Sequence, residues 1–106
     1  MNVSMSDLHT LLGNLTDKDL VLDVRDPEEY SAGHVPGSKN IPLSEVDKHV
    51  AELRPYQRVF VHCQRGGRAG KAGDLLVKLG LKNIVCVSGT GMADWIEAGY
   101  PWKDKP

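Results

Sequence analysis

The feature that most restricts the fold of this chain is a set of short apolar segments that alternate with helix-like segments. Three of them, at residues 20–24, 58–62 and 84–87, are rich in Val and other apolar residues and are too short for a helix. Runs of this length and composition are typical of strands that are buried on both faces. Because such strands form parallel sheets when helices separate them, the pattern predicts an α/β fold with a doubly covered parallel sheet.

Signals for helix boundaries stand between these strands. Asp26 with Pro27 and two glutamates after it predicts the start of a helix, and Gly33 predicts its end. A longer helix is expected over 68–79, with Gly80 as its stop. Shorter helices are expected at 4–12, 44–53 and 93–98, and an edge strand at 40–42.

Composition places the chain among ordinary globular proteins. Its 106 residues are expected to form one domain, 1–106, with 41% hydrophobic and 25% charged residues. Thirteen basic and fourteen acidic residues give a net charge of −1. Because nucleic-acid binding needs a basic face, this balance argues against a nucleic-acid partner.

The sequence also bears on location and on metal sites. No apolar run reaches the ~18 residues of a membrane helix, and residues 1–20 lack a secretory signal, so no membrane partner is expected. Two cysteines without an export signal favour free thiols in the reducing cytosol. The four histidines and the two cysteines lack ligand spacing, and we therefore expect no metal site.

The candidate chemistry lies at the ends of two predicted strands. In open parallel sheets, sites form beyond the carboxyl ends of the strands. Asp23 and Arg25 lie at the end of the first strand, and Cys63 follows the second. A cysteine is a nucleophile as its thiolate, which a helix N-terminus and nearby cations favour. Cys63 is therefore the candidate nucleophile.

The residues after Cys63 are suited to binding an anion. Gln64 and Arg65 are followed by Gly66 and Gly67, which can adopt positive φ so that backbone N–H groups converge on one point. Arg65 and Arg68 add donors for an oxyanion, and Arg68 could bind one with two hydrogen bonds. Packing alone does not place exposed cations beside a thiol, so this pattern predicts a binding loop.

In four segments, 22–30, 33–42, 59–70 and 91–101, the sequence resembles the rhodanese (thiosulfate sulfurtransferase) domain. The resemblance covers roughly residues 3–103, and it implies a five-stranded parallel sheet with helices on both faces. One departure is 88–91, Ser-Gly-Thr-Gly, where the family more often has paired glycines.

The resemblance also implies a reaction that needs no cofactor. The Cys63 thiolate would attack the outer sulfur of thiosulfate, sulfite would leave, and the Cys63 persulfide would be held by N–H groups of residues 64–68. Cyanide, a thiol or a protein cysteine would then take the sulfur. The donor could also be a protein persulfide, which needs only an exposed cysteine.

Two other functions fit parts of the pattern. Phosphatases and arsenate reductases of the same fold also have His-Cys at a strand end, as in His62-Cys63, but with five residues between Cys and Arg. Here four residues, 64–67, separate Cys63 from Arg68. A non-catalytic interaction module, or a persulfide relay in a protein complex, is the second alternative.

The residues outside the loop have several interpretations. Asp23 and Arg25 either brace the Cys63 loop or are only structural, with Asp23 satisfying backbone donors at the strand end and Arg25 paired to Glu28 or Glu29. Cys86 is interpreted as a core residue, with a resolving thiol as the alternative.

Two histidines and four apolar residues complete the expectations. His34 is expected to cap backbone groups in a turn, and His62 to pack under the loop. Trp102 is a candidate shield for the pocket. The residues expected in the core are Leu76, Trp95 and Ile96.

Overall fold

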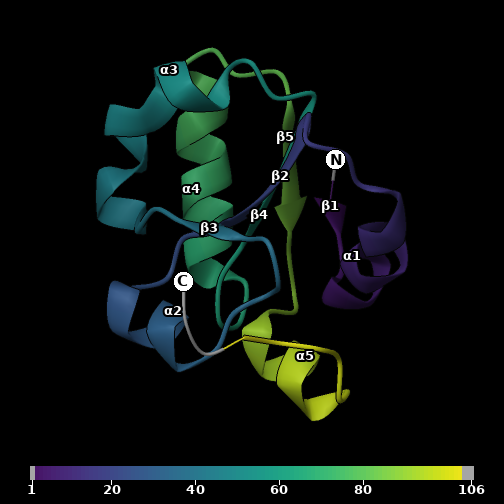
Figure 1. Ribbon diagram of the computed structural model, residues 1–106. Helices are drawn as coiled ribbons and strands as arrows, with labels where there is room; N and C mark the ends of the chain where they lie inside the picture. The colour runs from purple at the N-terminus through teal and green to yellow at the C-terminus, as the bar shows by residue number, and fades with distance from the viewer. Residues whose placement is uncertain (1, 104–106) are drawn as a thin grey trace.

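Five parallel strands form one sheet in the order β1-β5-β4-β2-β3 (Figure 1). The computed structural model describes residues 2–103. The three predicted buried strands are present within one residue of the expected bounds. The strands are β1 (Asn2–Val3), β2 (Asp19–Asp23), β3 (Lys39–Asn40), β4 (Arg58–His62) and β5 (Ile84–Val87).

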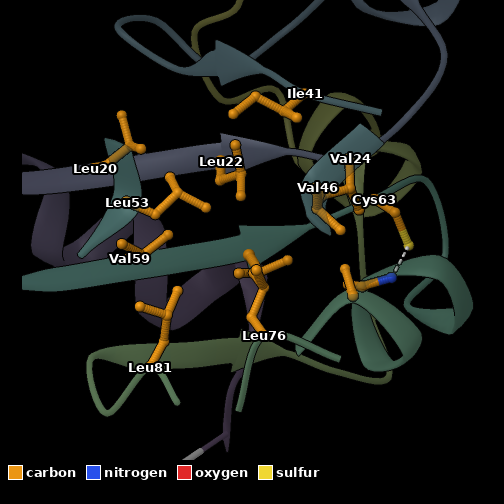
Figure 2. Packing of buried hydrophobic residues seen from close by; sticks show 13 residues of the cluster. Leu20, Leu22, Val24, Ile41, Val46, Leu53, Val59, Cys63, Leu76 and Leu81 are labelled. Atoms are coloured by element: carbon orange, nitrogen blue, oxygen red, sulfur yellow. Dashed lines mark hydrogen bonds between the residues drawn. The ribbon is translucent and has the colours of Figure 1, made fainter. Parts of the chain in front are cut away.

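Helices cover both faces of the sheet, as predicted. Alternate residues of a strand point to opposite faces, so Leu20 and Leu22 enter one core cluster and Val21 enters the other. The helices are α1 (Met5–Leu11), α2 (Pro27–Ala32), α3 (Val50–Leu53), α4 (Gly67–Lys78) and α5 (Met92–Glu97), with 3₁₀ segments η1 (Leu12–Asn14) and η2 (Leu43–His49). The first cluster packs under η2, α3 and α4 (Figure 2), and the second under α1 and α5.

The segment 43–53 differs from the single helix that the sequence predicts at 44–53. It begins as the 3₁₀ segment η2, whose N-cap is Pro42 with no side-chain hydrogen bond, and only its last turn, α3, is α-helical. His49 interrupts the helix with φ −114° and ψ 15°. Val46 and Leu53 are nevertheless fully buried, so the expected apolar face is kept.

Four core predictions have different outcomes. Leu76 and Trp95 are fully buried, as expected. Ile96 is 45% exposed, so its placement in the core was wrong. It follows Trp95 on α5, and successive helical residues lie on different faces, so only one of the two can face the sheet. Cys86 is only partly buried and packs against the edge of the first cluster.

The register of the central strands brings the candidate site together. Asp23 at the end of β2 is paired with His62 at the end of β4. Cys63 is the next residue and forms one end of the first core cluster (Figure 2). Asp23, Arg25 and Cys63 therefore reach the same edge of the sheet. Within residues 2–103, no helix has the length and apolarity to cross a membrane.

The packing of α4 leads to a first prediction, for two adjacent residues on opposite faces of the helix. Leu76 is fully buried and Val77 is 57% exposed. Leu76→Ala is expected to lower the free energy of unfolding by about 2–5 kcal/mol, because it leaves a cavity in the core. Val77→Ala should change it by less than about 0.5 kcal/mol. Urea unfolding of both variants measures this, and equal losses would contradict the assignment of the faces.

Candidate functional site

The sulfur of Cys63 lies inside a cradle of backbone N–H groups. The residue directly follows β4 and is 1% exposed. The N–H groups of Gly66 and Ala69 donate to Sγ, with N···S distances of 3.0 and 3.3 Å. Figure 2 shows the bond between Cys63 and the first turn of α4. These N–H groups and the helix N-terminus favour negative charge on the sulfur or on an atom attached to it.

The curl of the loop depends on one of its two glycines. Gly66 has φ +110°, a left-handed conformation that L side chains rarely adopt. A Cβ atom there would also lie 2.9 Å from the backbone nitrogen of Gly89. Gly67 does not have positive φ and instead begins α4. Of the two glycines for which the sequence allowed positive φ, only Gly66 adopts it.

The start of α5 holds the other side of the loop. Met92 N–H donates to the carbonyl oxygen of Cys63 at 2.8 Å, and Ala93 N–H donates to that of Gln64 at 3.3 Å. Gly91 lies so close that a Cβ atom would overlap both carbonyl groups. Gly91 was not predicted as a site residue, although it lies in the 88–91 segment that departs from the family pattern.

The structure brings Asp23 and Arg25 to the loop through Gln64. Arg25 is 3% exposed, and its Nε and Nη2 donate to the Asp23 carboxylate at 2.8–3.1 Å. Its Nη1 donates to Gln64 Oε1 at 3.0 Å, and its Nη2 also donates to the Gly33 carbonyl at 2.6 Å. The expected pairing of Arg25 with Glu28 or Glu29 was wrong, because Asp23 is the carboxylate beside it. The contact with Gln64 favours the bracing interpretation.

The two arginines of the loop differ in their surroundings. Arg68 donates two hydrogen bonds to Glu29, at 2.6 and 2.9 Å. This pairing lowers the pKa of Glu29 to about 2 and raises the pKa of Arg68 above its usual value. Arg65 is exposed and makes no ion pair within residues 2–103. No local pattern indicated that Glu29 would meet Arg68, which is 39 residues away in the chain.

Two histidines lie close to the site in the expected roles. His62 is fully buried beside the loop, and its Nδ1 lies 3.4 Å from the Cys63 carbonyl oxygen. Burial lowers the pKa of His62, so the ring is neutral at pH 7. His34 stacks on Tyr30, and its Nδ1 lies 2.8 Å from the Tyr30 carbonyl oxygen. Both histidines therefore contact the backbone around the site.

A hollow of about 320 Å³ opens beside Gln64. The ring of Trp102 lies over Gly33 on one side of it, because a Cβ atom at Gly33 would be 3.1 Å from that ring. Trp102 is 47% exposed, and its role as a shield for the pocket stays a prediction. The lining residues are Arg25, Glu29, Ala32, Gly33, Gln64 and Ile96.

Two further expectations concern thiols and metals. Cys63 and Cys86 are both free, so the alternative of a disulfide between them is not realised in this structure. Within residues 2–103, no cluster of three or more His, Cys, Asp or Glu side chains is arranged to hold a metal ion.

Comparisons with known proteins point in one direction. Residues 5–98 match the family described as "Rhodanese-like domain". The thiosulfate sulfurtransferase GlpE of Pseudoalteromonas translucida is 32% identical over 91 residues, which cover 84% of this chain and 85% of that protein. A rhodanese-related protein from Thermoplasma volcanium superposes with a TM-score of 0.83 at 37% identity, covering 98% of both chains.

Some relatives are longer than the matched region. The putative sulfur carrier protein YrkF of Bacillus subtilis is 40% identical over 75 residues, which are 71% of this chain but only 40% of that protein. For the uncharacterized protein YqhL of the same organism, the matched region covers 61% of that protein's length. The similarity to these relatives therefore concerns only part of their length.

The contact between Gly91 and the loop generates a prediction for stability. In Gly91→Ala, the added Cβ meets rigid backbone, so the free energy of unfolding should fall by about 1–3 kcal/mol. Gly70→Ala is the matched control, because Gly70 lies in α4 with open space around its Cβ position. It should raise that free energy by about 0.5–1 kcal/mol through helix propensity. Urea unfolding distinguishes them, and a harmless Gly91→Ala would contradict the close approach.

The ion pair of Glu29 generates a prediction for pH. Its pKa in the folded protein is about 2, below the ordinary 4.5, so its stabilisation is complete above pH 4.5 and is lost as the pH falls toward 2. Wild-type protein should therefore lose about 1 kcal/mol more than Glu29→Gln between pH 6 and pH 3, after allowance for solvent screening. Urea unfolding at both pH values measures the difference, and parallel losses would contradict it.

Proposed function

Because the chain belongs to the rhodanese-like domain family, we propose that it is a sulfurtransferase in which Cys63 carries the sulfur as a persulfide. The observation that carries this proposal is the buried sulfur at the end of β4, with the N–H groups of Gly66 and Ala69 directed at it. Relatives named as thiosulfate sulfurtransferases support the reaction class.

In the first half-reaction, the thiolate of Cys63 attacks the outer sulfur of thiosulfate. A sulfur–sulfur bond forms to Cys63 as the one within thiosulfate breaks, and sulfite leaves with the electron pair. The remaining Cys63 persulfide carries one negative charge. N–H groups of residues 64–69 would stabilise that charge, and no cofactor is required. Arg65 would attract the anionic donor. Arg68 would add to this attraction, but its pairing with Glu29 reduces its contribution.

In the second half-reaction, cyanide, a small thiol or a protein cysteine attacks the outer sulfur of the persulfide. The acceptor keeps that sulfur, and the electron pair of the broken bond restores the Cys63 thiolate. Covalent transfer in two steps predicts ping-pong kinetics. A protein persulfide could serve as donor by the same exchange. The expected cytosolic location belongs to this proposal, since both thiols are free.

The two alternative functions have less support. A phosphatase or arsenate reductase needs an arginine that clasps the oxyanion, and here Arg68 is engaged by Glu29. The loop also has four residues between Cys63 and Arg68 rather than five. A non-catalytic module has no need for a thiol held by two N–H groups.

The test is intact mass spectrometry after incubation with thiosulfate under non-reducing conditions. Wild-type protein and Cys86→Ser should each gain one sulfur atom, and cyanide should remove it. Cys63→Ser should gain none, because the remaining thiol, Cys86, has no such cradle. A gain that survives in Cys63→Ser, or no gain in a wild-type protein that alkylates readily at Cys63, would contradict thiosulfate transfer through this residue.

A further inference from the structure

The contact between Glu29 and Arg68 fills the position in which an oxyanion would bind Arg68. Glu29 lies in the first turn of α2, and Arg68 is the second residue of α4. The two guanidinium–carboxylate hydrogen bonds, at 2.6 and 2.9 Å, have the geometry that guanidinium also offers to sulfonates and phosphates. Each side chain is about one-third exposed, so the pair borders solvent at the site.

The charges around Cys63 are nearly balanced by this contact. Arg25 is matched by the buried carboxylate of Asp23, and Arg68 is matched by Glu29. Arg65 therefore remains as the loop arginine with no ion pair within residues 2–103. Asp26, at the N-cap of α2, adds negative charge that also acts on Arg68. Of the arginines Arg25, Arg65 and Arg68, only Arg65 is therefore left without an ion pair within residues 2–103 for a dianion that approaches the sulfur.

We propose that Glu29 determines which sulfur donors the site accepts, by holding Arg68 and so disfavouring dianions such as thiosulfate relative to persulfides of thiols. This inference rests on the proposed function. The Cys63 thiolate would attack the outer sulfur of R–S–SH, the bond within the donor would break, and RS⁻ would leave with the electron pair. The outer sulfur and its proton stay on Cys63, so atoms and charge balance without an oxidant or a reductant.

The hollow beside Gln64 supports a donor with an organic part. Ala32, Gly33 and Ile96 give it an uncharged side, and Ile96 is 45% exposed there. Its charged members, Arg25 and Glu29, are already paired with other side chains. The hollow lies beside Gln64, the residue that follows Cys63, and its lining residues offer an inorganic dianion no unpaired cation.

The direct test compares two alkylating probes of similar size at Cys63. Iodoacetate carries one negative charge and iodoacetamide carries none, so the ratio of their rate constants reports the electrostatic potential at the sulfur. Peptide mass spectrometry separates Cys63 from Cys86. In Glu29→Gln, the iodoacetate-to-iodoacetamide ratio should rise about three- to tenfold at low salt, because Arg68 is released.

Two further variants act as controls. Glu28→Gln removes the same charge from an exposed neighbour with no ion pair within residues 2–103, and it should change the ratio less than about twofold. The double variant Glu29→Gln/Arg68→Met removes both partners and should return the ratio to near the wild-type value. The rate with iodoacetamide alone checks that each variant keeps the site folded.

Sulfur loading then tests the donor class. For loading from thiosulfate relative to the persulfide of 2-mercaptoethanol, Glu29→Gln should shift the ratio of kcat/KM toward thiosulfate by at least the factor seen in the alkylation ratio, because thiosulfate carries two negative charges. An unchanged alkylation ratio in Glu29→Gln, or an equal change in Glu28→Gln, would overturn the role of Glu29 even in an active enzyme. If the alkylation ratio responds but neither donor loads wild-type Cys63, the proposed function itself is overturned.

Discussion

The site depends on a backbone that is fixed from two sides within a few residues. On one side the N–H groups of Gly66 and Ala69 reach the sulfur of Cys63, and on the other the first N–H groups of α5 reach the carbonyl oxygens of Cys63 and Gln64. With its carbonyl groups engaged elsewhere, the loop presents N–H groups to the sulfur. A negative charge on an attached atom then meets dipoles that need no reorganisation.

Ion pairs determine how strong a positive electrostatic potential an anionic ligand meets near Cys63. The Asp23–Arg25 pair is almost fully buried, so the cost of removing both ions from water offsets much of their attraction. Its extra hydrogen bonds to Gln64 and to the Gly33 carbonyl make it a positional element that joins β2 to the loop. The Glu29–Arg68 pair joins α2 to α4 at the border of the site, where a carboxylate competes with any anionic ligand.

Much of the fold could be predicted because its signals are local. The apolar runs at β2, β4 and β5 and the Asp26-Pro27 helix start need only neighbours in the chain. Cys63 and its loop could be singled out for the same reason. Two errors concern the side that a residue faces or the residue that it meets, because Ile96 is exposed and Arg25 pairs with Asp23. The third concerns local conformation, because 43–49 is a 3₁₀ segment and not part of an α-helix.

The sequence by itself determined the parallel α/β architecture and the placement of a cysteine between a strand and a helix N-terminus, because strand length, apolar pattern and helix signals act over a few residues. Only the tertiary structure decided that Gly91 lies against the Cys63 loop and that Glu29 holds Arg68 while Arg65 has no ion pair within residues 2–103. Those contacts join segments 28 and 39 residues apart. They arise from strand order and helix packing, which no local pattern specifies.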